Sequence, residues 1–405
     1  MKQDSILKRN WSLGLVMLFF VVISWVSSSF LLNTIFESNY YKKPIFITFC
    51  SVSSCSLYLL PLLRQFIKLY FKTGQFDIQT AYKLHYNNNN NVRKLSINEQ
   101  YTMILNEKYE ENIEQDHKEE SIDQEIIPLS SIIKLSIIFC TLWFGANVTT
   151  NTSLSYTSVT SQTILSSTAS FFTLFFGVLL GIDTINIYKL IGLIVSFIGI
   201  IIIVTKSTVS NSTNFNHLSY KSIIIGNILA LLGALIYGIY STFFKRSVLR
   251  ITEKYSKYGI APKVDVKLFL GFVGLFTFVG LWPILVVFHH TGFETFQFKF
   301  DIKIISIILL NCSITFLSDY CWAKAIILTT PLTVTVGLSF TIPLAMFGDF
   351  IFKGKQVTLC YVVGAILIFA SFILINQNDA SIEEEFEQQT LLKKTISNSY
   401  GSIEV

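Results

Sequence analysis

Residues 142–177, LWFGANVTTNTSLSYTSVTSQTILSSTASFFTLFFG, and residues 314–349, ITFLSDYCWAKAIILTTPLTVTVGLSFTIPLAMFGD, align without a gap when the chain is shifted by 172 positions. The alignment extends to 141–203 against 313–375 and runs through loops as well as apolar segments. Similar composition alone would not keep loops in register, so the chain contains an internal repeat. The matched residues include Phe144/Phe316, Thr157/Thr329, Thr163/Thr335, Ser167/Ser339, Phe175/Phe347, Gly192/Gly364 and Phe197/Phe369, and Asn147 falls opposite Asp319.

The composition of the 405 residues is that of a membrane protein. Apolar residues make up 51% and charged residues 14%, and the mean hydropathy is +0.54. A soluble domain carries about 25% charged residues. These values exclude a cytosolic enzyme, a disordered scaffold and a nucleic-acid binder. All 6 cysteines lie in apolar runs without metal-ligand spacing, so we expect no disulfide framework and no metal site.

Ten segments are long and apolar enough to cross a bilayer, which takes about 20 residues of helix. The repeat pairs the third, fourth and fifth of them with the eighth, ninth and tenth. Two halves of five helices each must then enter the membrane in opposite orientations. The predicted fold is an all-α polytopic membrane protein of ten transmembrane helices in two inverted repeats. The segments are 11–33, 44–63, 131–151, 157–181, 186–205, 222–244, 267–288, 302–326, 328–352 and 357–375.

The distribution of lysine and arginine predicts the orientation in the membrane. Basic residues follow the second segment and fill the connection between the sixth and seventh, from Lys245 to Lys267. The excess of Lys and Arg marks the cytosolic side. We therefore expect both termini in the cytosol.

A hydrophilic insertion interrupts the first half at 64–129. It contains the five asparagines Asn87 to Asn91 and an acidic stretch from Glu107 to Glu125, a composition typical of disorder. A tolerated linker and a regulatory arm are the two interpretations. The predicted organisation is 1–10 as the cytosolic N-terminus, 11–63 as spans one and two, 64–129 as the loop, 130–206 as spans three to five, 222–376 as spans six to ten and 377–405 as a disordered cytosolic tail.

Polar residues inside the apolar segments form two stripes at equivalent places in the halves. Side chains four residues apart share a helical face. Polar groups in hydrocarbon are costly and suggest a cavity. Asp319 would pair with a substrate cation or a proton, unless it is a buried carboxylate bonded to neighbouring helices. The first stripe is Trp143, Asn147 and Asn151, and the second is Asn311, Thr315 and Asp319 with Trp322 nearby.

Further candidates lie around these stripes. Lys324 could reach a solute from the rim of the site or extend to lipid headgroups. The fourth and ninth segments are rich in hydroxyl groups, which either line the site or allow close helix packing. Their repeat-related candidates are Thr163, Ser167, Thr335 and Ser339.

Several stretches resemble the drug/metabolite transporter superfamily, in the F branch of solute carrier family 35. They are SWVSSSFLLNTIFE (24–37), KKPIFITF (42–49), GALIYGIYSTFFKR (233–246) and the two repeat stretches. The similarity points to fungal vacuolar-membrane and thiamine-repressible members. It implies two EamA-type halves of five helices with spans three, four, eight and nine central. The FYNN and GALNK motifs of GDP-mannose carriers do not occur in the sequence, which argues against a nucleotide sugar.

The tail contains an acidic dileucine pattern, Glu387 followed by Leu391 and Leu392. Clathrin-type adaptors recognise such patterns when they sort membrane proteins to vacuoles or lysosomes. With the vacuolar members of the family, the motif favours the vacuolar membrane, and mitochondrial or Golgi membranes are the alternatives. The other expected partners are a small-molecule solute and the lipid bilayer.

The favoured function is a secondary transporter of a small organic solute that works by alternating access. A solute sensor that signals through the cytosolic loop is the alternative. An enzyme is not expected, because the sequence lacks an HxxxxD or DxD constellation. No GxxxxGK[ST] loop is present either, so we expect no ATP-driven motor and no cofactor.

Overall fold

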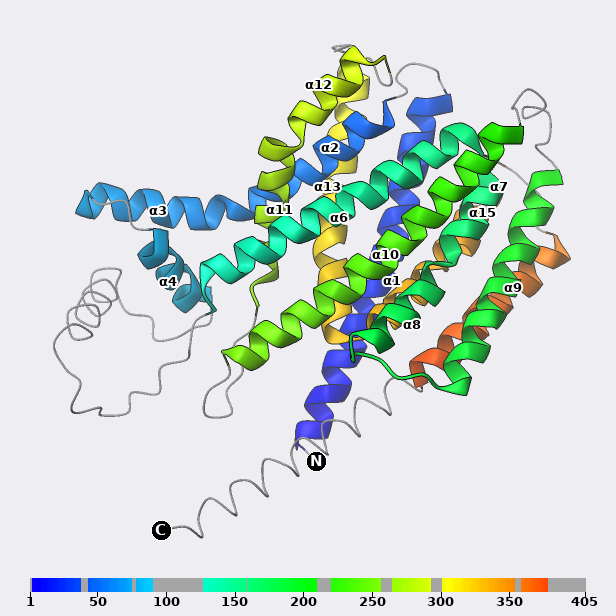
Figure 1. Ribbon diagram of the computed structural model, residues 1–405, viewed down its shortest axis with the longest axis horizontal. Helices are drawn as coiled ribbons and strands as arrows, with labels where there is room; N and C mark the ends of the chain where they lie inside the picture. Colours follow the sequence, from blue (N-terminus) through cyan, green and yellow to red (C-terminus); the bar gives the residue numbers. More distant parts are fainter. Residues whose placement is uncertain are drawn as a thin grey trace, which may run out of the picture. The chain divides into compact units, whose positions relative to one another are not determined.

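The structure is a computed structural model that describes residues 2–37, 43–74, 78–89, 127–157, 159–209, 220–255, 264–292, 301–353 and 358–377. Helices dominate these ranges, and no strand occurs within them. The labels follow Figure 1. The helices are α1 (Lys2–Glu37), α2 (Pro44–Ser54), η1 (Cys55–Leu59), α3 (Leu60–Thr73), α4 (Ile78–Asn89), α6 (Leu129–Tyr156), α7 (Val159–Ser167), α8 (Ala169–Leu179), α9 (Ile187–Val209), α10 (Tyr220–Lys254), α11 (Val266–Gly280), α12 (Trp282–His290), α13 (Ile302–Leu328), α14 (Pro331–Leu338), α15 (Thr341–Lys353) and an unlabelled helix at Leu359–Gln377.

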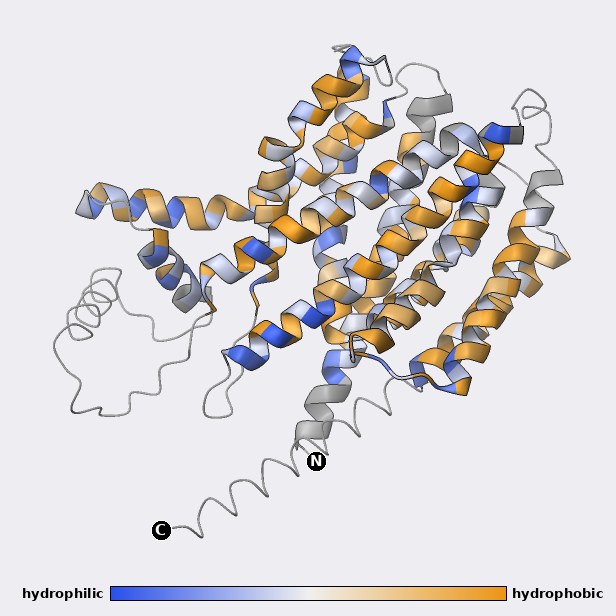
Figure 2. Ribbon diagram, in the orientation of Figure 1, coloured by the Kyte–Doolittle hydropathy of each residue, from blue (hydrophilic) through white to orange (hydrophobic). Residues whose placement is uncertain are grey.

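Ten helical stretches are long and apolar enough to span a membrane, which confirms the predicted all-α polytopic fold. Figure 2 shows hydrophobic residues along much of the length of these helices. Two stretches run further than expected. The second reaches Thr73 through η1 and α3, and the sixth reaches Lys254. The predicted sixth span ended at 244, so Lys245 lies inside α10 and not in a loop.

The fourth and ninth spans are both broken near their middles. α7 ends at Ser167 and α8 begins at Ala169, whereas α14 ends at Leu338 and α15 begins at Thr341. The repeat shift of 172 takes Thr168 to Phe340, which lies inside the second break. Pro343 falls in the first turn of α15, where its missing N–H needs no partner within the helix. The two halves thus repeat an irregularity as well as a sequence.

The described residues group into two compact units. Unit 1 comprises Met1–Ser51, Thr141–Arg246 and Phe288–Val405, and unit 2 comprises Val52–Cys140 and Ser247–Val287. Unit 1 holds the candidate site residues. Within it, α1 packs along α13, α14 and α15.

Reciprocal packing in unit 1 relates the two halves by a pseudo-twofold axis. One apolar cluster joins α8, α9 and α14 to the last helix, and the other joins α7, α9 and α15 to it. A shift of 172 converts members of one cluster into members of the other. The same shift converts the close approach of Gly199 to Gly364 into that of Ser371 to Gly192. The cluster pairs are Leu174/Met346, Val336/Ile164, Phe372/Ile200 and Ile375/Ile203.

Unit 2 is built on α11. η1 packs against α11, and a Cβ on Gly274 would collide with the backbone of Ser56, so glycine is required at this contact. The first part of α6 also packs here, through a Ser136 hydroxyl that donates to the Phe269 carbonyl at 3.0 Å.

Part of the predicted disordered loop is helical. Residues 64–73 belong to α3 and residues 78–89 to α4, which packs beside α3 (Figure 1). Leu69 of α3 packs with Ala81 and Leu84 of α4 in a small apolar cluster. The apolar residues in this segment recur at helical spacing. The disorder prediction missed this pattern because it rested on the average composition of the whole loop. Residues 90–126, including the acidic stretch, lie outside the described residues.

Candidate functional site

α13 carries the buried polar residues of the second half. The helix begins after Asp301, whose carboxylate caps it by accepting from the Lys303 amide at 2.9 Å. Asp319 is 7% exposed and Trp322 is 5% exposed, although both lie in a helix long enough to span a membrane. A carboxylate in such a place is costly and is retained where it has partners or a function.

Trp322 is surrounded by aromatic side chains of α10. Its ring lies 6.1 Å from that of Phe244 in a stacked arrangement and 5.9 Å from that of Tyr240. Tyr240 in turn contacts Tyr237 with ring centroids 5.0 Å apart, and it lies close enough to Asp319 for an electrostatic interaction. Asp319 therefore lies near Tyr240, which belongs to a group of four aromatic rings.

A chain of polar contacts runs from this aromatic group into the first half. The indole N–H of Trp322 donates to the Tyr237 hydroxyl at 3.3 Å, and that hydroxyl also hydrogen-bonds with Thr335 on α14. The hydroxyls of Thr335 and of Thr173 on α8 are 3.4 Å apart. Because α8 belongs to the first half and α14 to the second, the chain crosses the interface between the repeats, with Thr173 after the break in the fourth span and Thr335 before the break in the ninth.

Asn311 belongs to a second group of contacts, on the side of α13 that faces α1. It is 2% exposed, its amide donates to the Ser51 hydroxyl at 3.0 Å, and its carbonyl accepts from the Ser28 hydroxyl at 2.5 Å. The Trp25 indole N–H donates to the Ser318 hydroxyl at 2.8 Å. These bonds fasten α1 to α13, so Asn311 holds helices together in this conformation.

The other predicted site residues lie outside this chain of contacts. The Asn147 amide donates to the Trp143 carbonyl in its own helix at 2.8 Å, and the Ser167 hydroxyl donates to the Ile164 carbonyl at 2.6 Å. The side chain of Asn151 and the motif Glu387, Leu391 and Leu392 lie outside the described residues. The half-buried candidates are Trp143, Asn147, Thr163, Ser167, Thr315, Lys324 and Ser339.

Three features of unit 1 were not predicted from the sequence. Tyr237 was missed, although its spacing with Tyr240 and Phe244 puts three aromatics on one helical face. Lys245 is 7% exposed, and its ammonium donates to the carbonyls of Ile327 at 2.8 Å and Thr329 at 2.7 Å, which caps the end of α13. Asp183 and Lys189 form a buried ion pair between α8 and α9.

Comparisons with known proteins agree with this architecture. Residues 118–205 match the EamA-like transporter family. An uncharacterised vacuolar membrane protein of Saccharomyces cerevisiae is 43% identical over 100% of this chain and 98% of its own length. A thiamine-repressible mitochondrial transport protein of the same yeast is 40% identical over 92% of this chain and 94% of its own.

More distant similarities extend to animals and to a solved structure. Solute carrier family 35 member F5 of Pongo abelii is 29% identical over 91% of this chain and 77% of its own length. A crystal structure aligns with a TM-score of 0.56 at 10% identity, covering 92% of this chain and 99% of the other. At that identity the alignment supports the fold alone.

Proposed function

Because the chain belongs to the EamA-type drug/metabolite transporters, in the F branch of solute carrier family 35, we propose that it moves a small organic solute across a membrane by alternating access. The observation that carries the proposal is the polar chain from Trp322 through Tyr237 and Thr335 to Thr173. It joins the two repeats beside a buried carboxylate, which is where secondary transporters built from inverted repeats bind their solutes.

Asp319 is the residue to which we assign charge recognition. A carboxylate near Tyr240, whose ring contacts Trp322, suits a solute with a cationic group, because the carboxylate pairs with the charge and aromatic rings attract cations. In the absence of solute, the same carboxylate can take up a proton. The solute and the proton would then compete for the Asp319 carboxylate, and this competition is a simple basis for solute/proton exchange.

Thr173 and Thr335 are the contact that we expect to change during the transport cycle. Their hydroxyls are 3.4 Å apart, and each donates its one proton to a carbonyl of its own helix, Thr173 to Ala169 and Thr335 to Pro331, both at 2.7 Å, so the contact between them is polar without being a hydrogen bond. Separation of the two hydroxyls leaves both still hydrogen-bonded. The halves can therefore part here at little cost in unsatisfied polar groups.

We assign the chain to the vacuolar membrane, with both termini in the cytosol. The yeast relative named as a vacuolar membrane protein and the basic residues of the predicted cytosolic segments support this placement.

Uptake into proteoliposomes tests the proposal. The purified protein is offered labelled amino acids, polyamines, thiamine and its phosphates, and nucleotide sugars, at internal and external pH values set separately. We expect uptake of one class to depend on the pH gradient in the wild type and to be lost at every pH in Asp319→Asn, because the variant lacks the carboxylate that binds both the solute and the proton. Uptake by the variant with an unchanged dependence on pH would contradict the role given to Asp319.

A further inference from the structure

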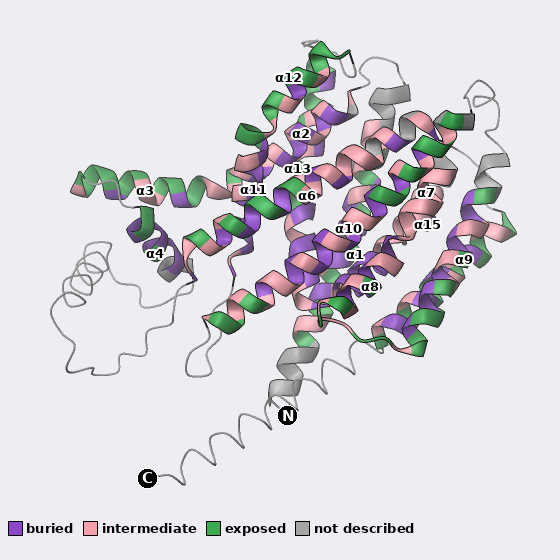
Figure 3. Cartoon of the chain, viewed as in Figure 1, coloured by how far each residue is buried: buried purple, intermediate pink, exposed green. Residues whose placement is uncertain are grey.

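α3 has three distinct faces, of which two are exposed. Its buried face packs against α4 through Leu69 and Phe66. A second face is apolar yet exposed, and Phe71 at its end is 83% exposed. Figure 3 shows exposed residues along most of the helix. The exposed apolar face consists of Leu60, Leu63, Ile67, Tyr70 and Phe71, and the third, basic face consists of Arg64, Lys68 and Lys72 at intervals of four residues.

α3 is a poor candidate for the hydrocarbon core itself. The stretch Ile45–Thr73 has 29 residues. At 1.5 Å per residue it is about 44 Å long, against about 30 Å of hydrocarbon. α2 and η1 with the first turn of α3 already fill that thickness. The three cations of α3 therefore fall at the level of the lipid headgroups.

α4 holds α3 in this orientation. The Tyr82 hydroxyl donates to the Ile127 carbonyl at 2.8 Å, and His85 Nε2 lies 3.6 Å from Asp265 Oδ2 at the start of α11. α4 thus contacts the segment before α6 and the start of α11, and α3 packs against α4. These contacts hold α3 in place, so its apolar face is exposed in a defined orientation.

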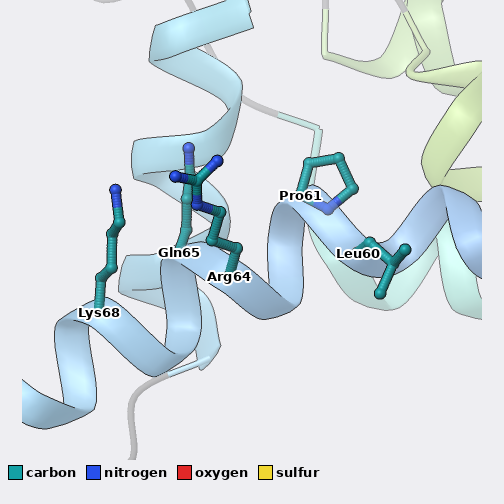
Figure 4. Close-up of a pocket in the computed structure, with 5 residues that line it drawn as sticks. All are labelled: Leu60, Pro61, Arg64, Gln65 and Lys68. Carbon is teal, nitrogen blue, oxygen red and sulfur yellow. The ribbon is translucent and has the colours of Figure 1, made fainter.

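A hollow of about 430 Å³ lies along the basic face of α3. Its lining residues are Leu60, Pro61, Arg64, Gln65 and Lys68. Figure 4 shows that the side chains of Arg64, Gln65 and Lys68 extend to one side of the helix. Within the described part of the chain, Arg64 and Lys68 make no hydrogen bond or ion pair, and the buried Gln65 Oε1 has no hydrogen-bond partner.

We propose that α3 is an interfacial helix and that this hollow binds the phosphate of an acidic phospholipid of the surrounding bilayer. Arg64 and Lys68 contact the phosphate, and the Gln65 amide can present its NH2 to it after a half-turn. The acyl chains cover Leu63 and Ile67 on the neighbouring face. Amphipathic helices with basic and apolar faces lie in membrane interfaces in this way. The site lies in unit 2 and does not depend on the proposed transport function.

Native mass spectrometry of the full chain in detergent tests the proposal, with phosphatidylserine as the probe and phosphatidylcholine as the zwitterionic comparison. We expect tighter binding of phosphatidylserine, and a loss of about 30-fold in its affinity in Arg64→Gln/Lys68→Gln, because each basic residue near an acidic membrane surface contributes about 1 kcal/mol. Phosphatidylcholine carries the same phosphate beside its own choline cation, so its weaker binding should fall by a smaller factor.

Arg250→Gln/Lys254→Gln is the matched control. It removes two basic residues from the end of α10, also in unit 2 and away from the hollow. We expect it to bind phosphatidylserine as the wild type does. The proposal fails if the control loses as much affinity for phosphatidylserine as Arg64→Gln/Lys68→Gln does, or if Arg64→Gln/Lys68→Gln loses none. It also fails if inorganic phosphate displaces the lipid at equal concentration. Equal melting temperatures of all three proteins without added lipid establish that they are folded.

Discussion

The hydroxyl of one residue, Tyr237, connects the aromatic group to the interface of the repeats. It accepts from Trp322 and hydrogen-bonds with Thr335, so its loss leaves the indole N–H without its acceptor. Removal of a hydrogen-bonded partner in a buried place costs about 1–3 kcal/mol. The proposed function adds a second consequence, because the same hydroxyl lies beside the solute.

A pair of Tyr→Phe variants separates stability from function. The Tyr361 hydroxyl donates to the Pro343 carbonyl at 2.7 Å in the same unit, away from Asp319. We expect Tyr237→Phe and Tyr361→Phe to lower thermal stability by a similar amount. Only Tyr237→Phe should lower the rate of solute uptake, by about tenfold, which corresponds to about 1.4 kcal/mol. Equal uptake in both variants would remove Tyr237 from the site.

At the scale of single elements, α11 depends on Asp265, the residue that precedes its first turn. The Asp265 carboxylate caps the helix by accepting from the Lys267 amide at 2.9 Å and the Leu268 amide at 3.3 Å, and it pairs with His85 of α4. Burial alone would raise the pKa of Asp265, but the hydrogen bond from His85 and those from the two amides outweigh it and hold the pKa below its usual value.

The lowered pKa of Asp265 predicts how unit 2 responds to pH. A carboxyl group with a lowered pKa in the folded state stabilises the fold above its unfolded pKa of about 3.9, and this contribution is lost as the pH falls through the folded value. Asp265→Asn removes the charge but keeps a side chain that caps the helix well. Asp265→Ala removes both the charge and the cap, so we expect it to lower the free energy of unfolding by about 1 kcal/mol more than Asp265→Asn does.

Hydrogen exchange of the α4 and α11 amides measures this effect. We expect protection in the wild type to fall as the pH drops from about 5 to 3, after correction for the intrinsic exchange rate. In Asp265→Asn that fall should be smaller, with α11 still capped. Identical pH profiles in the two proteins would show that the Asp265 charge does not stabilise this contact.

The sequence predicted the elements that repeat and missed the contacts that cross between them. The ten spans follow from apolar length, and the pairing Thr163/Thr335 and Ser167/Ser339 correctly placed the two halves in register. Tyr237 was not selected because a tyrosine in a span is equally suited to the membrane interface. The Thr173–Thr335 contact at the end of the same chain joins residues that are 162 positions apart, a separation that no local pattern reveals.

Asn311 shows what helical spacing leaves undetermined. Its spacing with Thr315 and Asp319 suggested one continuous polar stripe for a solute. The structure instead satisfies its amide with Ser28 and Ser51 of α1 and α2. Helical spacing identifies a shared face, but it does not say whether a neighbouring helix already covers part of that face.

At the scale of the whole molecule, the two repeats supply both the fold and the proposed mechanism. Their packing is reciprocal, as the pairs Leu174/Met346 and Ile375/Ile203 illustrate. Inverted repeats of this kind can exchange their conformations and thereby turn one access path into its mirror counterpart. A solute site that responds to this exchange belongs at the interface of the halves, beside Asp319.

The central claim is that a solute binds between the repeats at Asp319, and a thermal-shift titration of the purified protein tests it most directly. A ligand that binds the folded state raises the apparent stability in a saturable way. Across amino acids, polyamines, thiamine and its phosphates, and nucleotide sugars, we predict that one class stabilises the wild type and that Asp319→Asn abolishes the shift. A shift of equal size and midpoint in Asp319→Asn would contradict the account.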